Sequence, residues 1–272
     1  MDAPGTATER LVPVNDRGLA YGDGLFETIA IVNGEAPWLD RHLARLARGC
    51  HTLGLKPPDE HAVRARVEAA AAHAPDLILK IIAVREAGGR GYQPGPDAAT
   101  VLHFLTAPLP AVDDEAVTQG VDVPLLPFRL TPAGPLCGLK HLNRLEQVLA
   151  SQTLQGYREG LLLDRFARVV EGTRTNLFAV RNATLITPRL SESGVAGVLR
   201  EAILDWAVQQ RMPVEEVDLY PYELADCEEA MLVNSVLGVW PIRSVMLRPH
   251  GATLATFAPG PHTRALQAQF GR

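Results

Sequence analysis

Lysine is scarce in this chain of 272 residues. Its 26 basic residues include only three lysines, Lys56, Lys80 and Lys140, and all the others are arginine. A guanidinium stays protonated in proteins, whereas a lysine can lose its proton and become a nucleophile. A position that holds lysine against this bias is therefore a candidate for a reactive amine.

Other scarcities exclude whole classes of function. The net charge is −5 and no basic stripe is interleaved with aromatic residues, so we expect no nucleic-acid partner. The longest apolar runs have the length of a strand, which argues against a membrane span. Met1 to Val14 lacks a cationic segment followed by an apolar one, and this predicts a cytoplasmic protein.

Metal-binding and disulfide patterns are also lacking. The three cysteines, Cys50, Cys137 and Cys227, lie far apart, and no two of them have C-x-x-C spacing. The eight histidines include no H-x-x-x-H pair. We therefore expect neither a disulfide framework nor a zinc or iron site.

Lys140 has the more suggestive surroundings of the two lysines that could react. It follows an irregular approach rich in proline and glycine, Pro127 to Gly138, and it is predicted to open a helix. The buried stripe of that helix is predicted to be Leu142, Leu145, Val148 and Leu149. Lys80 lies inside a strand pattern, where a lysine more often points to solvent. A solvated lysine at a helix start remains the alternative interpretation of Lys140.

Helical and strand patterns alternate along the first half of the chain. Asn33-Gly34 between apolar runs is typical of a type I′ hairpin, and Asp40 is expected to cap a helix. The predicted elements are a glycine-punctuated loop at Asp16 to Thr28, hairpin strands Thr28 to Val32 and Glu35 to Trp38, helices Asp40 to Leu53 and Glu60 to His73, and strands Leu77 to Arg85 and Ala99 to Leu105.

The second half reads in the same way after a polar segment. Two prolines, two aspartates and a glutamate within Ala107 to Gly120 predict a linker at residues 111–120, between an N-terminal domain, residues 1–110, and a C-terminal domain, residues 121–272. The predicted strands are Val121 to Leu126, Gly160 to Asp164, Val169 to Val180 with a turn, Thr184 to Thr187, Glu228 to Val233 and one around Ile242, with helices following Ser193 and from about His262. We predict an α+β fold whose two domains meet at a cleft.

Several residues are suited to hold a phosphate. Arg45 lies on the helix face shared with His42, and a guanidinium fork matches two phosphate oxygens. A surface salt bridge to Asp40 or Glu35 is the alternative for Arg45. Gly197, just before a predicted helix, leaves free N–H groups that favour an anion. Ser235 follows a strand and could complete the site.

An acidic residue completes this inventory. Glu171 follows two valines, so it would point from a strand end into whatever lies at the edge of the sheet. A reactive lysine, an acid and phosphate donors together suit pyridoxal phosphate, which needs a Schiff-base amine, a partner for its pyridine nitrogen and a phosphate cradle.

An ordered set of motifs resembles a known enzyme family. The motifs are Tyr21-Gly22-Asp23-Gly24, His42-Leu43-Ala44-Arg45-Leu46, Lys140, Glu171 through Phe178, Gly197-Val198-Leu199-Arg200, and Asn234-Ser235 with Pro241-Ile242. They are similar to those of the fold-type IV pyridoxal phosphate enzymes, which include branched-chain and D-amino-acid aminotransferases and aminodeoxychorismate lyases. The resemblance covers nearly the whole chain.

The resemblance implies a role for several residues. Lys140 would form the Schiff base and carry the proton of the reaction, and Glu171 would keep the pyridine nitrogen protonated. Arg45, the backbone N–H groups of Val198 and Leu199, and Ser235 would hold the phosphate. The resemblance also implies a two-domain fold with the cofactor in the cleft, and a homodimer in which a loop of the partner reaches that cleft.

Two stretches resemble one branch of the family more closely. Lys140 to Leu149 and Gly88 to Tyr92 are similar to the aminodeoxychorismate lyases, which implies conversion of 4-amino-4-deoxychorismate to 4-aminobenzoate and pyruvate. Phe26-Glu27-Thr28 resembles the aminotransferase branches instead, so transamination of D-amino or branched-chain amino acids stays open. Candidate substrate contacts are Tyr21, Arg90, Tyr92, Asn143 and Arg174; for Arg174 a plain surface position is the alternative.

Overall fold

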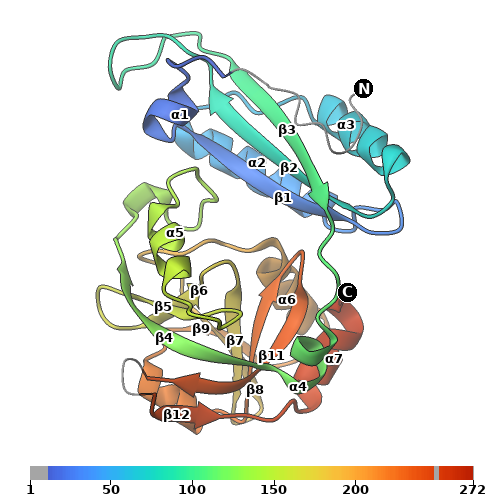
Figure 1. The fold of residues 1–272 in the computed structure, drawn as a ribbon, viewed down its shortest axis with the longest axis vertical. Helices are drawn as coiled ribbons and strands as arrows, with labels where there is room; N and C mark the ends of the chain where they lie inside the picture. The colour runs from blue at the N-terminus through green and yellow to red at the C-terminus, as the bar shows by residue number, and fades with distance from the viewer. Residues whose placement is uncertain (1–11, 248–250, 272) are drawn as a thin grey trace.

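The chain forms two β-sheets joined by one crossing (Figure 1). The computed structural model describes residues 12–247 and 251–271, so the expectation about Met1 to Val14 lies largely outside the described residues. Within these two ranges, no helix has both the length and the apolar character that a membrane span needs. The prediction of an α+β fold is confirmed.

The first sheet is small and antiparallel, with strand order β1-β2-β3. Its elements are α1 (Arg17–Tyr21), β1 (Gly24–Ile31), α2 (Leu39–Leu53), α3 (Glu60–His73), β2 (Leu77–Arg85) and β3 (Thr100–Pro108). The predicted apolar face of α2 is buried at Leu43, Leu46 and Cys50. Side chains alternate along a strand, so β1 presents one face to α2 and the other to the second half of the chain.

Two local predictions in this half are wrong. No return strand follows Asn33-Gly34, because β1 pairs along its length with β2, and Val32 and Glu35 form only an isolated bridge. The predicted turn itself forms, because Asn33 and Gly34 both have positive φ and Val32 and Glu35 exchange two backbone hydrogen bonds, but β2 rather than Glu35 to Trp38 is the strand that pairs with β1. Asp40 does not cap α2, since Trp38 occupies the cap position and Asp40 lies in the first turn.

The second sheet has nine strands in the order β10-β11-β4-β5-β6-β7-β8-β9, with β12 beside β11. Because β10 also pairs with β7, part of this sheet closes on itself. Its elements are α4 (Asp114–Gln119), β4 (Val121–Leu130), η1 (Gly134–Leu136), α5 (Leu145–Gln152), β5 (Leu161–Asp164), β6 (Val169–Gly172), β7 (Asn176–Arg181), β8 (Thr184–Pro188), α6 (Val198–Gln209), β9 (Val214–Val217), η2 (Pro221–Asp226), β10 (Glu229–Asn234), β11 (Gly238–Met246), β12 (Thr253–Thr256) and α7 (Pro261–Phe270).

The segment predicted as a linker, residues 111–120, is not irregular throughout. It contains α4, which is capped by Asp113, buries Ala116 and contacts β11. The chain passes from the first sheet to α4 in the single crossing seen in Figure 1. The division into two domains at this segment stays a prediction.

The helix predicted after Lys140 begins later than expected, and its apolar stripe is exposed rather than buried. It starts at Leu145, so Lys140 lies in the loop before it. Leu145, Val148 and Leu149 are 69%, 50% and 43% exposed, and Ala150 is the only buried residue of α5. The prediction that this stripe is buried is wrong, because periodicity identifies a helix face but not the element that covers it.

Candidate active site

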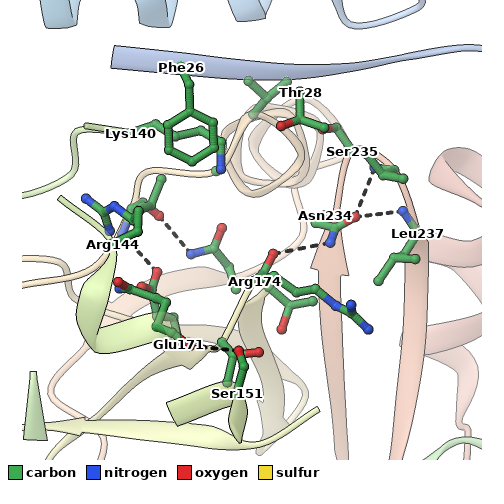
Figure 2. A pocket seen from close by; sticks show the side chains of 18 of the residues that line it. Phe26, Thr28, Lys140, Arg144, Ser151, Glu171, Arg174, Asn234, Ser235 and Leu237 are labelled. Carbon is green, nitrogen blue, oxygen red and sulfur yellow. Dashed lines mark hydrogen bonds between the residues drawn. The ribbon is translucent and has the colours of Figure 1, made fainter. Parts of the chain in front are cut away.

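A cavity of about 780 Å³ lies between the two sheets. Phe26 and Thr28 of β1 and Arg45 of α2 line it from the first half of the chain. Lys140, Glu171 and Ser235 are among its lining residues from the second half. Figure 2 shows the side chains of Phe26, Thr28, Lys140, Glu171 and Ser235 around the same space, so residues far apart in the sequence meet here.

The loop that carries Lys140 is fixed to β1. The backbone N–H of Phe26 donates to the carbonyl of Lys140 at 3.0 Å, and that of Leu142 donates to Gly24 at 3.0 Å. The amine of Lys140 lies 4.3 Å from the centroid of the Phe26 ring. Burial, with a further contribution from the positive charge of Arg45, lowers the pKa of Lys140 to about 8. A useful fraction of this lysine is therefore an uncharged amine near neutral pH.

The same loop is also bonded to the segment that leads into α6. Gly138 donates from its N–H to the carbonyl of Gly194 at 3.0 Å, and Ala196 donates to Gly138 at 2.9 Å. The loop of Lys140 thus lies between β1 on one side and residues 194–196 on the other. Backbone bonds on both sides restrict where the amine can point.

Glu171 is the buried acid of the cavity. It stands in β6 and is 4% exposed, and it accepts a hydrogen bond from the N–H of Val195 at 2.8 Å. Burial raises the pKa of Glu171 to about 7, and the bond from Val195 and the charges of Arg144 and Lys140 offset this only in part. Such a carboxyl group can hold or share a proton near neutral pH.

The start of α6 lies at the cavity and has the features that suit an anion. Gly197 is the N-cap and makes no side-chain cap bond, so the first N–H groups of the helix lack a side-chain partner. Gly197 and Val198 line the cavity, whereas the side chain of Leu199 is buried away from it. A Cβ at position 197 would collide with the side-chain oxygen of Asn176, so a larger residue here would displace that side chain.

Ser235 lies across from α6 on the turn between β10 and β11. The side chain of Asn234 fixes this turn, because its Oδ1 accepts from the N–H groups of Val236 at 2.9 Å and Leu237 at 2.6 Å (Figure 2). Asn234 belongs to a motif of the sequence but had no predicted role. Its bonds explain why Ser235 faces the cavity.

Arg45 does not pair with Asp40 or Glu35. Its Nε and Nη2 donate to the two carboxylate oxygens of Glu27 at 2.9 and 2.6 Å. Asp40 accepts from Arg64 instead. The alternative of a surface salt bridge is therefore wrong, and Arg45, 6% exposed, is a buried residue at the cavity wall.

The sequence from β1 to β11 matches the family model of class IV aminotransferases over residues 24–245. This chain belongs to the class IV aminotransferase family. Within that family it is 33% identical over 236 residues to an aminodeoxychorismate lyase of Vibrio harveyi, which covers 86% of this chain and 87% of that protein. It is 26% identical to a D-alanine aminotransferase of Bacillus licheniformis over 96% of this chain and 90% of that one.

Solved structures give the same placement. The 4-amino-4-deoxychorismate lyase of Pseudomonas aeruginosa is 42% identical, superposes with a TM-score of 0.87 and covers 95% of this chain and 94% of its own. A branched-chain aminotransferase of Thermoproteus uzoniensis is 25% identical, with a TM-score of 0.81, over 96% of this chain and 88% of its own. The prediction of family and fold is confirmed.

Arg174 lies at the rim of the cavity of this class IV chain. Its side chain is 59% exposed, its Nη2 donates to the carbonyl of Arg158 at 3.2 Å, and its Nε is 3.8 Å from Glu159. Glu159 is fully buried and accepts the N–H of Thr173 at 2.7 Å, which fixes the turn between β6 and β7. No sequence signal marks Glu159, because its partners become neighbours only in the fold.

Tyr21, Arg90, Tyr92 and Asn143 do not line the cavity of their own chain. Tyr92 is 85% exposed, and its ring contacts that of Tyr21 at 5.4 Å between centroids. Asn143 donates to the carbonyl of Gly22 at 3.3 Å. Their roles toward a substrate stay predictions.

Two basic residues lie where sequence reasoning did not place them. Arg144 lines the cavity and donates to the carbonyls of His141 and Leu139 at 2.9 and 3.1 Å. The amine of Lys80 lies 5.0 Å from the Phe26 ring, so this lysine is on the same sheet face as the cavity rather than turned to solvent. Lys80 does not line the cavity.

Proposed function

We propose that this protein is a pyridoxal phosphate-dependent lyase that converts 4-amino-4-deoxychorismate to 4-aminobenzoate and pyruvate. The observation that carries the proposal is one cavity that holds both Lys140 and Glu171, in a chain 42% identical to a 4-amino-4-deoxychorismate lyase. The class IV family and the lyase of Vibrio harveyi support the same reaction.

The residues present fit the cofactor. Arg45, the first N–H groups of α6 at Val198 and Leu199, and Ser235 would hold the phosphate. Glu171 would hold the pyridine nitrogen, and Lys140 would be the point of covalent attachment. Gly197 and Val198 line the cavity at the start of α6, where backbone N–H groups and the helix dipole favour an anion.

Pyridoxal phosphate, when bound, supplies a sink for the electron pair that is left when a carbon beside the nitrogen loses its proton. Lys140 would take that proton, because its pKa of about 8, lowered by burial, leaves a minor but reactive fraction of the amine unprotonated near neutral pH. The buried Glu171, whose pKa is about 7, would share a proton with the ring nitrogen and so favour its charged form. Lys140 would then return the proton to the departing enolpyruvyl group, which would leave as pyruvate while the ring becomes aromatic.

The test is a product assay without a keto-acid acceptor. The purified protein with pyridoxal phosphate should turn 4-amino-4-deoxychorismate into equal amounts of 4-aminobenzoate and pyruvate. The second candidate is an aminotransferase for D-amino or branched-chain amino acids, favoured by Phe26-Glu27-Thr28 and by the D-alanine aminotransferase relative. Turnover of D-alanine or leucine with 2-oxoglutarate, and no lyase product, would replace the proposal by this alternative.

We also propose that the protein is a homodimer. The apolar stripe of α5 at Leu145, Val148 and Leu149 is exposed in the single chain and continues to the cavity at Val148. The loop that carries Arg90 and Tyr92 is held by Arg17, which donates to the carbonyl of Tyr92 at 2.8 Å, yet it lies away from its own cavity. A partner's cavity is where this loop would act.

The proposed compartment is the cytoplasm. Cys50, Cys137 and Cys227 are all free thiols. Unpaired cysteines are typical of proteins that stay in a reducing compartment.

A further inference from the structure

Glu27 is a buried acid next to the cavity that the proposed reaction does not use. It lies in β1 between Phe26 and Thr28, which both line the cavity. Because side chains alternate along a strand, Glu27 points to the opposite face, toward α2. It is 2% exposed, and its two partners on α2, His42 and Arg45, are 1% and 6% exposed.

Both carboxylate oxygens of Glu27 accept hydrogen bonds from Arg45. Oε1 accepts from Nε at 2.9 Å and Oε2 accepts from Nη2 at 2.6 Å. A two-point contact of this kind fixes the plane of the guanidinium as well as its position. His42 Nδ1 lies 2.7 Å from the same Oε2, which restrains the carboxylate itself.

Arg45 is in turn hydrogen-bonded to the backbone just before α6. Its Nη1 donates to the carbonyl of Ala196 at 2.9 Å, and Ala196 directly precedes the N-cap Gly197. These three bonds use three of the five N–H groups that a guanidinium carries. The remaining two are available to a ligand in the cavity that Arg45 lines.

We infer that Glu27 is a positioning residue, which holds Arg45 and, through it, the Ala196–Gly197 backbone in the arrangement that a phosphate requires, and which balances the charge of Arg45 beside Lys140. This inference rests on the proposed function, because it assumes that the ligand is pyridoxal phosphate. The role explains why the ion pair between Glu27 and Arg45 is buried. Removing two charges from water costs free energy, and the well-aligned hydrogen bonds of this pair offset that cost.

The charges around the pair agree with this role. Burial by itself would raise the pKa of Glu27, but the charge and hydrogen bonds of Arg45, with the bond from His42, lower it to about 2. Burial lowers the pKa of His42, and its Nε2 has no partner in the described part of the chain, as suits a neutral ring that donates from Nδ1. Glu27 and Arg45 therefore cancel at neutral pH.

The protonation of the Lys140 nitrogen would change if the charge of Glu27 no longer balanced that of Arg45. The charged groups that act on it are Arg45 and Arg144, which lower its pKa, and Glu27 and Glu171, which raise it. The substitution Glu27→Gln removes one of the two negative charges and leaves Arg45 uncompensated. Both effects make a positive charge on the Lys140 nitrogen less favourable.

The first experiment titrates the visible absorption band of the protein reconstituted with pyridoxal phosphate. In Glu27→Gln we expect the midpoint of the titration to fall by about one pH unit, which corresponds to roughly tenfold in proton affinity. Glu27→Asp keeps the charge and should return the midpoint to within about 0.3 unit of the wild type. Glu229→Gln is the matched control: Glu229 is 4% exposed, accepts from Thr263 at 2.8 Å, and does not line the cavity.

The second experiment tests the two-point contact between Arg45 and Glu27 in a variant that keeps the positive charge at position 45. Arg45→Lys should bind pyridoxal phosphate at least about tenfold more weakly, because lysine offers neither the two-point contact with Glu27 nor a rigid link to Ala196. Its affinity for pyridoxal, which lacks the phosphate, should change less than about threefold, because the lost contacts serve the phosphate alone.

The outcomes separate this inference from the proposed function. A wild-type protein that binds no pyridoxal phosphate would refute the function and the inference together. A wild type that binds it normally, with an unshifted midpoint in folded Glu27→Gln, would overturn the inference alone. Wild-type affinity for pyridoxal phosphate in Arg45→Lys would do the same, and it decides the matter if Glu27→Gln does not fold.

Discussion

The amine of Lys140 lies 4.3 Å from the centroid of the Phe26 ring, and this contact joins the two halves of the chain at the cavity. The ring face attracts a cation. Burial and the charge of Arg45 nevertheless lower the pKa of Lys140 to about 8. The amine of Lys80 lies 5.0 Å from the same ring without lining the cavity. The two lysines therefore form a natural pair for comparison.

Lys140→Ala should abolish covalent attachment of pyridoxal phosphate, because no other amine lines the cavity in the described part of the chain. The measurement is the visible absorption band of the reconstituted protein, together with the added mass after borohydride reduction. Lys80→Ala is the control, since it removes an amine from the same sheet face, and it should keep both the band and the mass. Loss of the band in Lys80→Ala with retention in Lys140→Ala would reverse the assignment.

Glu171→Gln should stabilise the cofactor-free protein at alkaline pH. The pKa of Glu171 is raised from 4.5 in the unfolded chain to about 7, so its contribution is fully present below pH 4.5 and is lost as the pH rises through 7. The free energy of unfolding of the wild type should fall relative to the variant by up to about 3 kcal/mol between pH 4 and pH 8. Urea unfolding at several pH values measures this difference.

Glu229→Gln provides a control of opposite sign for that measurement. Burial opposes the charge of Glu229, but bonds from Thr263 and His262 outweigh it and lower the pKa of this carboxyl group. Its contribution is therefore present above the unfolded pKa, and the glutamine variant should be less stable than the wild type at neutral pH. The prediction for Glu171 would be refuted if the free energy of unfolding had the same pH dependence in Glu171→Gln and in the wild type, because the pKa of Glu171 would then be unshifted by folding.

Arg174→Met should raise the KM for 4-amino-4-deoxychorismate several-fold and change kcat less than about twofold, if its exposed guanidinium at the cavity rim contacts a substrate carboxylate. Steady-state kinetics measures both constants. Arg158→Met is the matched control, because Arg158 forms surface ion pairs with Asp113 and Glu115 and does not line the cavity. An unchanged KM in Arg174→Met would leave this arginine as a surface residue.

A charge on the stripe of α5 should break the proposed homodimer. Leu145→Asp together with Leu149→Asp places two carboxylates on the exposed apolar face, and sedimentation should then show a monomer that has lost most of its activity. Val208→Asp on α6 is the control, because Val208 is 68% exposed but lies on a different helix. A wild-type protein that sediments as a monomer at micromolar concentration would refute the dimer.

Sequence patterns predicted an element correctly where neighbouring residues in the chain stabilise it. The bounds of α3 and β2 were predicted to the residue. In the structure Asp59 caps α3, and an apolar run broken only by Lys80 forms β2. The return strand expected after Asn33-Gly34 and the buried stripe expected on α5 were wrong for one shared reason. A turn signal or a periodic face does not say which distant segment will compete for it or cover it.

The sequence by itself determined which residues could do the chemistry. A lysine kept against an arginine bias and a glutamate at the end of an apolar strand are readable without a fold, and both line the cavity. Only the tertiary structure decided their state. Burial and neighbouring charges bring the pKa values of Lys140 and Glu171 toward neutrality. The partner of Arg45 also became visible only there, since Glu27, Arg45 and Ala196 are remote in the chain and meet through the packing of β1, α2 and α6. Desolvation and Coulomb interactions depend on distances in space, and those distances are set by the fold.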